Sequence, residues 1–261
     1  MPRDLFILGC GRSGTSLLAG LFRSSGYFQG TRLYRPRDSN PHGFFEDADV
    51  NDINEVILGP VAPQRRCHDG ITYMADAPGR GQHWLARIPL GTTLSCDASA
   101  NDRIAAVLSR RPFCLKDPRF CYTLAWWRAH APEARMICVF RHPRLVVASI
   151  LKEVATMPYL ADFALSTRAA FEVWRLMYGH VLERHALSGD WLFVEYADLF
   201  RAPVLDRISA FSEAAIDSNL PDPQLNRSKP VDLVDPAAEA LYEELVVRSR
   251  TTLDSSKRRS A

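Results

Sequence analysis

The stretch Gly9-Cys10-Gly11-Arg12-Ser13-Gly14-Thr15-Ser16 decides how the rest of this chain is interpreted. An apolar run at residues 5–8 precedes it, and apolar residues at helical spacing follow it at positions 17–22. This order predicts a buried strand, a glycine-rich turn and a helix. Backbone N–H groups at such a turn point toward a bound anion, and glycines let the backbone approach a phosphate closely. The stretch therefore predicts a phosphate-binding loop.

Two common nucleotide motifs fit this loop only in part. The spacing G-x-x-x-x-G is the first half of a nucleoside-triphosphate loop, but Thr15 stands where that motif needs Lys. The spacing G-x-G-x-x-G is the dinucleotide fingerprint, which needs an acidic residue about 20 positions further on, after a second strand. Residues 26–32 predict no clear strand, and the first acidic residue after the loop is Asp38. A glycine turn that binds no ligand is the remaining alternative.

The composition is that of a globular protein without a strong charge bias. The chain has 261 residues, of which 47% are hydrophobic and 24% charged, and its net charge is +2. This balance gives no support to a nucleic-acid partner. Because no run has the length and apolarity of a signal sequence or a membrane span, we expect a cytoplasmic location.

The six cysteines show no metal-type spacing, and we expect no metal site. Cys10, Cys114 and Cys138 fall in or just after predicted buried strands, which suits free core thiols. Cys67 and Cys96 lie in less regular sequence and could form a disulfide.

Strands and helices alternate along much of the chain. We expect strands at 113–115, 136–140 and 191–194 besides the first one at 5–8. Helices are predicted at 15–25, 50–58 and 160–187, and around 104–108 and 124–127. Asp47 or Asp49 would cap the helix at 50–58. Two further helices would begin at Pro143 and at about residue 198. Residues 59–100 read as a variable insertion or lid, and residues 251–261 as a frayed tail.

This alternation predicts a single domain over residues 1–261. Its fold would be a three-layer α/β fold, in which helices flank both faces of a parallel sheet. Ligands bind such sheets at the carboxyl ends of the strands. We therefore expect one edge to collect the polar loops that follow the strands, namely residues 9–16, Lys116-Asp117, Arg141-His142 and Glu195-Tyr196.

A second anion site is predicted from Arg141 and Ser149. Arg141 directly follows a predicted buried strand, and Ser149 lies eight positions later on the following helix. Eight residues are about two helical turns, which places Ser149 on the same face of the helix as its start. The two side chains could therefore hold one phosphate between them.

Together these motifs resemble those of the sulfotransferases that use 3′-phosphoadenylyl sulfate (PAPS). In that family a loop of the form Arg/Lys-Ser-Gly-Thr-Ser/Thr binds the 5′-phosphosulfate, and residues 12–16 match it at each position. An Arg that ends a strand and a Ser eight residues later bind the 3′-phosphate, and Arg141 and Ser149 match this pair.

Three further phrases are similar to members of the family. Lys116-Asp117-Pro118 resembles the Lys-Asp-Pro of protein-tyrosine sulfotransferases and of bacterial relatives. Residues 40–46 and 194–199 resemble segments of the bacterial members. The resemblance departs at Arg12, where cytosolic sulfotransferases have Lys. It also departs at residues 29–32, where the catalytic Glu of the tyrosine-sulfotransferase branch has no match.

The resemblance implies a P-loop nucleotide-kinase-like fold and a metal-independent transfer of a sulfuryl group. The donor would be PAPS, and the acceptor a hydroxyl or amine of a small molecule, a sugar or a lipid. The alternatives are a nucleotide or small-molecule kinase and a non-catalytic module that binds PAP, the desulfated nucleotide. A dehydrogenase is the least favoured class.

The resemblance also implies roles for individual residues. Arg12 and Lys116 would stabilise the charge on the departing phosphate, and Glu46 would be the general base, with His42 as the alternative. PAPS would be held by Gly11, Arg12, Ser13, Gly14, Thr15, Ser16, Arg141, Ser149 and Arg227.

Overall fold

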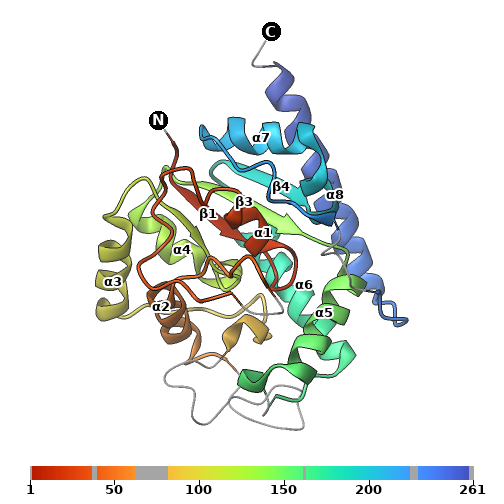
Figure 1. Ribbon diagram of the computed structural model, residues 1–261. Helices are drawn as coiled ribbons and strands as arrows, with labels where there is room; N and C mark the ends of the chain where they lie inside the picture. Colours follow the sequence, from red (N-terminus) through yellow and green to blue (C-terminus); the bar gives the residue numbers. More distant parts are fainter. Residues whose placement is uncertain (1, 37–39, 63–81, 161–162, 224–228, 259–261) are drawn as a thin grey trace.

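A parallel sheet forms the centre of the molecule (Figure 1). The computed structural model describes residues 2–36, 40–62, 82–160, 163–223 and 229–258. Within them the strands are β1 (Leu5–Leu8), β2 (Cys114–Lys116), β3 (Arg135–Phe140) and β4 (Trp191–Glu195), in the order β2-β1-β3-β4. All neighbouring pairs are parallel, and Ile7 of β1 lies opposite both Lys116 and Ile137. The predicted strands and the parallel arrangement are therefore confirmed.

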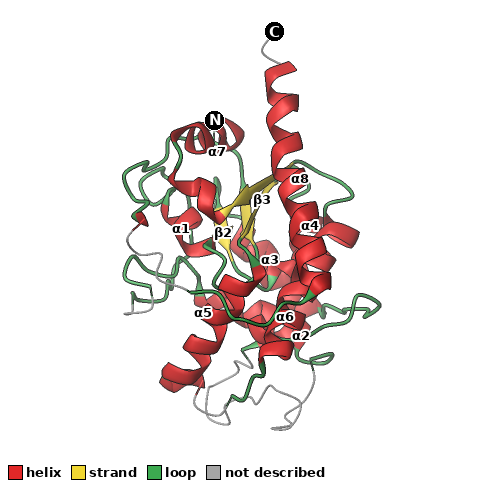
Figure 2. Ribbon diagram, turned by 90° about the vertical axis from the view of Figure 1, so that its right-hand side faces the viewer, coloured by secondary structure: helices red, strands yellow, loops and turns green. Residues whose placement is uncertain are grey.

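Apart from Lys116, Arg135 and Glu195 at strand ends, the strands are apolar, because helices cover both faces of the sheet. Side chains alternate across a strand, so Leu5 and Ile7 of β1 pack in one core while Phe6 and Leu8 pack in the other. Figure 2 shows the sheet between α1 and α7 on one side and α4 and α8 on the other. The three-layer α/β fold predicted from the sequence is thus confirmed.

Two helices cover the smaller core, α1 (Thr15–Gly20) and α7 (Ala202–Ser212). The sequence predicts the start of α1 correctly, but the predicted end at residue 25 is wrong. After Gly20 the chain continues in turns closed by i to i−3 hydrogen bonds, such as Arg23 N–H to Gly20 O at 3.1 Å. Gly and Ser are poor helix formers, and the following residues 24–26 are Ser-Ser-Gly.

The remaining helices belong to the larger core. They are α2 (Ala48–Leu58), α3 (Ala98–Leu108), α4 (Phe120–His130), α5 (Pro143–Thr156), α6 (Thr167–His180) and α8 (Pro236–Arg258). Asp47 caps α2 by accepting hydrogen bonds from the N–H groups of Asp49 and Val50, so the first of the two predicted caps is the one used. Pro143 stands at the start of α5, as predicted.

Helix boundaries elsewhere differ from the prediction. The helix expected at 160–187 begins only at Thr167, because Ser166 caps it, and then continues as a π-helical turn at Val181–His185. A 3-10 turn, Tyr196–Phe200, precedes α7 where the sequence predicts a helix from residue 198. The final helix extends to Arg258, although residues 251–261 are predicted to fray; the Thr251 hydroxyl donates to the Val247 carbonyl oxygen at 2.7 Å within it.

Part of the predicted insertion at 59–100 belongs to the core. Residues 63–81 lie outside the described part, but a 3-10 turn at His83–Leu85 follows them. Trp84, Leu85, Ala86 and Ile88 are all buried. Cys10, Cys114 and Cys138 are buried free thiols, whereas Cys67 lies outside the described residues and its pairing with Cys96 stays a prediction.

The loop after β1 is tightly packed at Gly9, and a substitution there can test this packing. Its φ is +144°, and a Cβ added there would stand 2.1 Å from the Val139 carbonyl oxygen. Gly26 has a φ of +76° with no atom within 4 Å of such a Cβ, so it serves as the matched control. Gly26→Ala should lower the free energy of unfolding by about 1–2 kcal/mol through backbone strain alone. Gly9→Ala should lower it by about 3 kcal/mol or more, because the steric overlap adds to the strain. Equal losses in denaturant titrations would contradict this account.

Candidate active site at the carboxyl edge of the sheet

The carboxyl ends of the four described strands bring the predicted polar loops to one edge. Gly14 of the first loop lies against Tyr196, which follows β4: a Cβ at Gly14 would be 2.3 Å from the Tyr196 ring. Arg141, which follows β3, places its guanidinium carbon 4.7 Å from the centroid of the same ring. The loop, Tyr196 and Arg141 therefore form one continuous surface.

Tyr178 on α6 fixes the loop at residues 9–16 through hydrogen bonds of its hydroxyl group. Its hydroxyl donates to the Val139 carbonyl oxygen at 2.8 Å, accepts from the Cys10 N–H at 3.2 Å and lies 3.0 Å from the Ser13 Oγ. The Ser13 N–H donates to the Cys10 carbonyl oxygen at 3.1 Å, and Ser13 is fully buried. Ser13, a predicted ligand residue, thus has its hydroxyl and N–H engaged within the protein. Sequence reasoning missed Tyr178, because a buried tyrosine on an apolar helix face looks like an ordinary core residue.

Arg12 joins the two predicted anion motifs. Its Nε donates to the Ser149 Oγ at 3.1 Å, and one terminal nitrogen lies 3.5 Å from the Glu153 carboxylate. Its backbone has a φ of +70°, in the left-handed region that few non-glycine residues adopt. The residues that the sequence assigns to separate phosphate sites are therefore in direct contact. Glu153, four residues after Ser149, was not singled out from the sequence.

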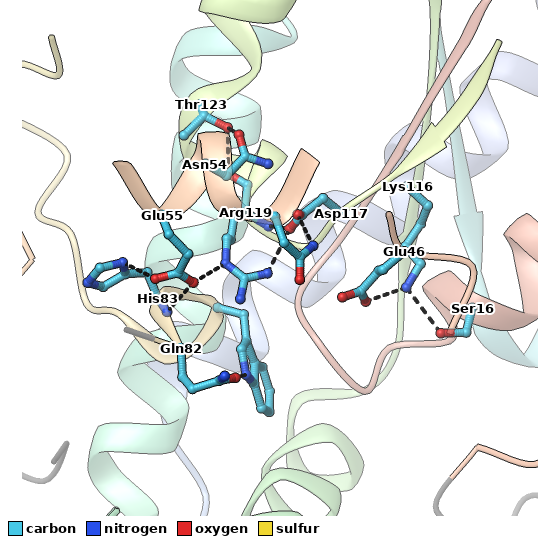
Figure 3. A network of polar contacts seen from close by, with 12 residues as sticks. Ser16, Glu46, Asn54, Glu55, Gln82, His83, Lys116, Asp117, Arg119 and Thr123 are labelled. Atoms are coloured by element: carbon cyan, nitrogen blue, oxygen red, sulfur yellow. Dashed lines mark hydrogen bonds and ion pairs between the residues drawn. The ribbon is translucent and has the colours of Figure 1, made fainter. Parts of the chain in front are cut away.

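Lys116 lies between two other predicted site residues (Figure 3). Its Nζ donates to the Glu46 Oε1 at 2.5 Å and to the Ser16 Oγ at 3.2 Å. The Lys116 side chain is fully buried, whereas that of Glu46 keeps 15% of its surface exposed. Burial lowers the pKa of the Lys116 ammonium, and the charge of Glu46 offsets part of that effect. The cluster places a cation, a carboxylate and a hydroxyl within hydrogen-bond reach of one another.

The structure shows fewer contacts for the other predicted site residues. Thr15 is buried and Ser16 partly exposed at the start of α1. His42 is exposed, and the hydrogen bonds described for Lys116 go to Ser16 and Glu46. Arg227 lies outside the described residues.

A buried ionic network adjoins Lys116 and was not predicted (Figure 3). Arg119 donates to the Glu55 Oε1 at 2.5 Å and to the Asp117 Oδ1 at 3.1 Å. Glu55 also accepts from the His83 backbone N–H at 2.9 Å, and its second carboxylate oxygen contacts Nδ1 of the His83 ring. The network ties the end of β2 to α2 and to the segment that follows the undescribed residues. Asp117 therefore orients Arg119, because it accepts hydrogen bonds from both the backbone N–H and the guanidinium group of Arg119.

One signal in the sequence could have indicated this network. Asn51, Asn54 and Glu55 recur at the i, i+3, i+4 spacing of a single helix face. All three are buried: Asn51 donates to the Asp117 Oδ2 at 2.6 Å, and Asn54 accepts from Trp127 at 2.8 Å. A polar face on a helix inside an apolar protein indicates an internal hydrogen-bonded network.

Trp84 covers the first loop from the side of the 3-10 turn at His83–Leu85. A Cβ at Gly11 would lie 2.5 Å from the Trp84 ring, so only glycine fits this close approach. The contact explains why Gly11 is needed for packing, whether or not it also contacts a ligand. Because His83 is bonded to Glu55, the ionic network also sets the position of its neighbour Trp84.

Two features are absent from the described residues. No described helix is both long and apolar enough to cross a membrane. No group of three or more His, Cys, Asp or Glu side chains in the described ranges is arranged to hold a metal ion.

Fold and site together define an α/β protein with a glycine-rich loop and a buried lysine at the carboxyl edge of its sheet. A family model described as "Sulfotransferase family" matches residues 3–211. The chain therefore belongs to the sulfotransferase family, and the resemblance drawn from its motifs is confirmed.

Two solved structures are similar to this chain, and the first agrees with the assignment at the level of the fold. The sulfotransferase domain from the curacin biosynthetic pathway is 15% identical, with a TM-score of 0.50 and coverage of 94% of this chain and 98% of that one. A sulfotransferase from Alicyclobacillus acidocaldarius is 13% identical, with a TM-score of 0.49 and coverage of 97% and 96%. No curated protein gives a significant match to this sequence.

Glu55 makes the stability of this site dependent on pH. Burial alone would raise the pKa of its carboxyl, but the charge of Arg119 and the hydrogen bonds from His83 lower it from 4.5 to about 2. A lowered pKa stabilises the fold above the unfolded value, and this stabilisation is lost as the pH falls from about 4.5 to about 2. Denaturant titrations across this range should show a loss on the order of a few kcal/mol from this group.

Glu55→Gln provides the control for this prediction. The variant should be less stable at neutral pH, because Arg119 would lose a buried charge partner. It should also lose less stability than the wild type between pH 4.5 and 2, since the titrating group is gone. Parallel pH curves for the two proteins would show that Glu55 does not carry the effect.

Proposed function

We propose that this chain transfers a sulfuryl group from PAPS to a hydroxyl or amine of a small-molecule, sugar or lipid acceptor. The observation that carries the proposal is the hydrogen bond from Arg12 to Ser149, within a member of the sulfotransferase family. PAPS bears a phosphosulfate at the 5′ position and a phosphate at the 3′ position of one ribose. A site for it must therefore bring two anion-binding motifs within the reach of a single nucleotide, as the contact between Arg12 and Ser149 does.

In this proposal the loop at residues 9–16 holds the 5′ end of the nucleotide, and Arg141 with Ser149 holds the 3′-phosphate. Arg suits this task because its planar guanidinium can donate two parallel hydrogen bonds to a phosphate. Tyr178 fixes the loop from the inside, and Tyr196 supports both Gly14 and Arg141. These supports keep the donors in place before the nucleotide binds.

Lys116 and Glu46 would have different roles in the transfer. The acceptor oxygen or nitrogen forms a bond to sulfur while the bond from sulfur to the phosphate oxygen breaks, and its electron pair stays on that oxygen. Lys116 and Arg12 stabilise the negative charge that develops there. Glu46 takes the proton that the acceptor loses. The products are PAP, the sulfated acceptor and a proton.

The Lys116–Glu46 ion pair supports this division of roles. The lysine is fully buried, so its charge acts with little screening from water, while the partly exposed Glu46 can be reached by an acceptor. Ser16 ties the pair to the loop that would carry the phosphosulfate. The contact between Lys116 and Glu46 supports a site in which the proposed cation and the proposed base lie close together.

Nucleotide binding provides the first test. PAP should bind without a metal ion and raise the melting temperature, with a stabilisation of about 2.7 kcal/mol at a ligand concentration of 100 Kd. Arg141→Ala should weaken PAP binding by about 1.5–3 kcal/mol but leave adenosine 5′-phosphate binding nearly unchanged, since only PAP carries the 3′-phosphate. Arg201→Ala, which breaks an exposed ion pair with Asp198, is the control. A thermal shift with MgATP and none with PAP would instead favour a kinase.

Replacing the proposed base provides the second test. With an acceptor found by screening phenols, sugars and amines for PAP release, Glu46→Gln should lower turnover by roughly 10²–10⁴. PAP affinity should change little, because the amide keeps the shape of the side chain. His42→Ala is the matched variant on the same loop and should retain activity. The opposite pattern would make His42 the base, and full activity in both variants would restrict this loop to shaping the acceptor pocket.

A further inference from the structure

Glu153 is a buried carboxylate within the proposed anion site. It lies on α5 four residues after Ser149, so the two side chains share one face of the helix. Only 3% of Glu153 is exposed. A negative charge at this place opposes the binding of a phosphate, and neither the loop nor the Lys116 cluster accounts for it.

Its contacts show which group this carboxylate serves. One oxygen faces the Arg12 guanidinium at 3.5 Å, and the other accepts a hydrogen bond from the Tyr159 hydroxyl at 2.9 Å. Burial, followed by the charge of Glu153, raises the pKa of Tyr159, so the phenol keeps its proton and remains a donor. Glu153 is thus held by Tyr159 on one side and contacts Arg12 on the other.

Arg12 is consequently oriented by α5 as well as by its own loop. Its Nε is bonded to Ser149, and a terminal nitrogen faces Glu153 one helical turn further along. A guanidinium is planar and its donors are fixed relative to one another, so two contacts on one helix face set the direction of the whole group. This matters because the Arg12 backbone has a φ of +70°, an uncommon conformation for its residue type.

We propose that Glu153, fixed by Tyr159, is a positioning residue that sets Arg12 for the transfer step. The proposal rests on the sulfotransferase function proposed above and assigns a role to two residues outside the recognised motifs. Glu153 contacts neither nucleotide nor acceptor in this account, and it exchanges no proton. It acts only by directing the Arg12 cation toward the phosphate oxygen on which charge develops.

A double-mutant cycle tests whether Glu153 acts through Arg12. The variants are Glu153→Gln, Arg12→Ala and the combination of both, and the rate is that of PAP release from PAPS. Glu153→Gln alone should lower turnover about tenfold or more while PAP affinity stays equal or rises, because a repulsive charge is removed. In the Arg12→Ala background the same change should alter turnover by less than about twofold. Tyr159→Phe, which removes a single hydroxyl, should also lower turnover. This variant replaces Glu153→Gln in the test if Glu153→Gln folds poorly.

Glu172→Gln is the matched control, because it also removes the carboxylate of an Arg–Glu pair, at 2.8 Å from Arg87, without touching the site. An equal loss of turnover from Glu153→Gln with and without Arg12 would overturn the proposal and make Glu153 a direct participant. Full turnover in both Glu153→Gln and Tyr159→Phe would overturn it as well.

A second measurement needs no acceptor. In nitrogen-15 NMR spectra, the Arg12 Nε–H signal, assigned with Arg12→Lys, should be protected in the wild type and lost to exchange in Glu153→Gln. An unchanged signal would contradict the positioning role. If the wild type binds no PAP, the proposed function fails and this inference fails with it; if it binds PAP and the signal is unchanged, only this inference fails.

Discussion

The site depends on keeping a buried ammonium group charged. Lys116 is the last residue of β2, and its side chain has no exposed surface. An unpaired charge at such a depth is costly, so the fold must supply partners. Glu46 and Ser16 do this from two different loops, and both loops are thereby drawn onto the end of β2. One buried cation thus fixes how the loop after β1 and the loop before α2 meet.

The same arrangement recurs around two other cations of the edge. Arg119 lies between Glu55 and Asp117, and Arg12 faces Glu153. Each pair limits the repulsion that neighbouring cations would otherwise exert on one another. The edge can therefore hold several cations close together in the folded protein. Buried pairs of this kind contribute orientation more than net stability, because desolvation cancels much of their attraction.

The sequence allowed us to predict where several site residues lie in the fold, but it said less about which side chains they contact. Lys116 and Arg141 could be placed at one edge because each directly follows an apolar run, and parallel strands end together. Ser13 shows the limit of motif reading, since spacing does not say where a side chain points, and its hydroxyl is bonded inward. Tyr178 and Glu153 act through contacts between elements far apart in the chain. Their local sequence is that of an ordinary helix, so no periodicity could single them out.

The contact between Tyr178 and the loop after β1 has a consequence for how the protein is made. The hydroxyl of Tyr178 binds the N–H of Cys10, a residue 168 positions earlier. During synthesis the loop emerges among the first residues, but the side chain that shapes it follows well over a hundred residues later. Such distant pairings form late in folding, because a long loop must close before they are gained. The nascent amino-terminal segment therefore lacks this contact until α6 has been synthesised, and the final shape of the loop after β1 depends on a residue from the second half of the chain.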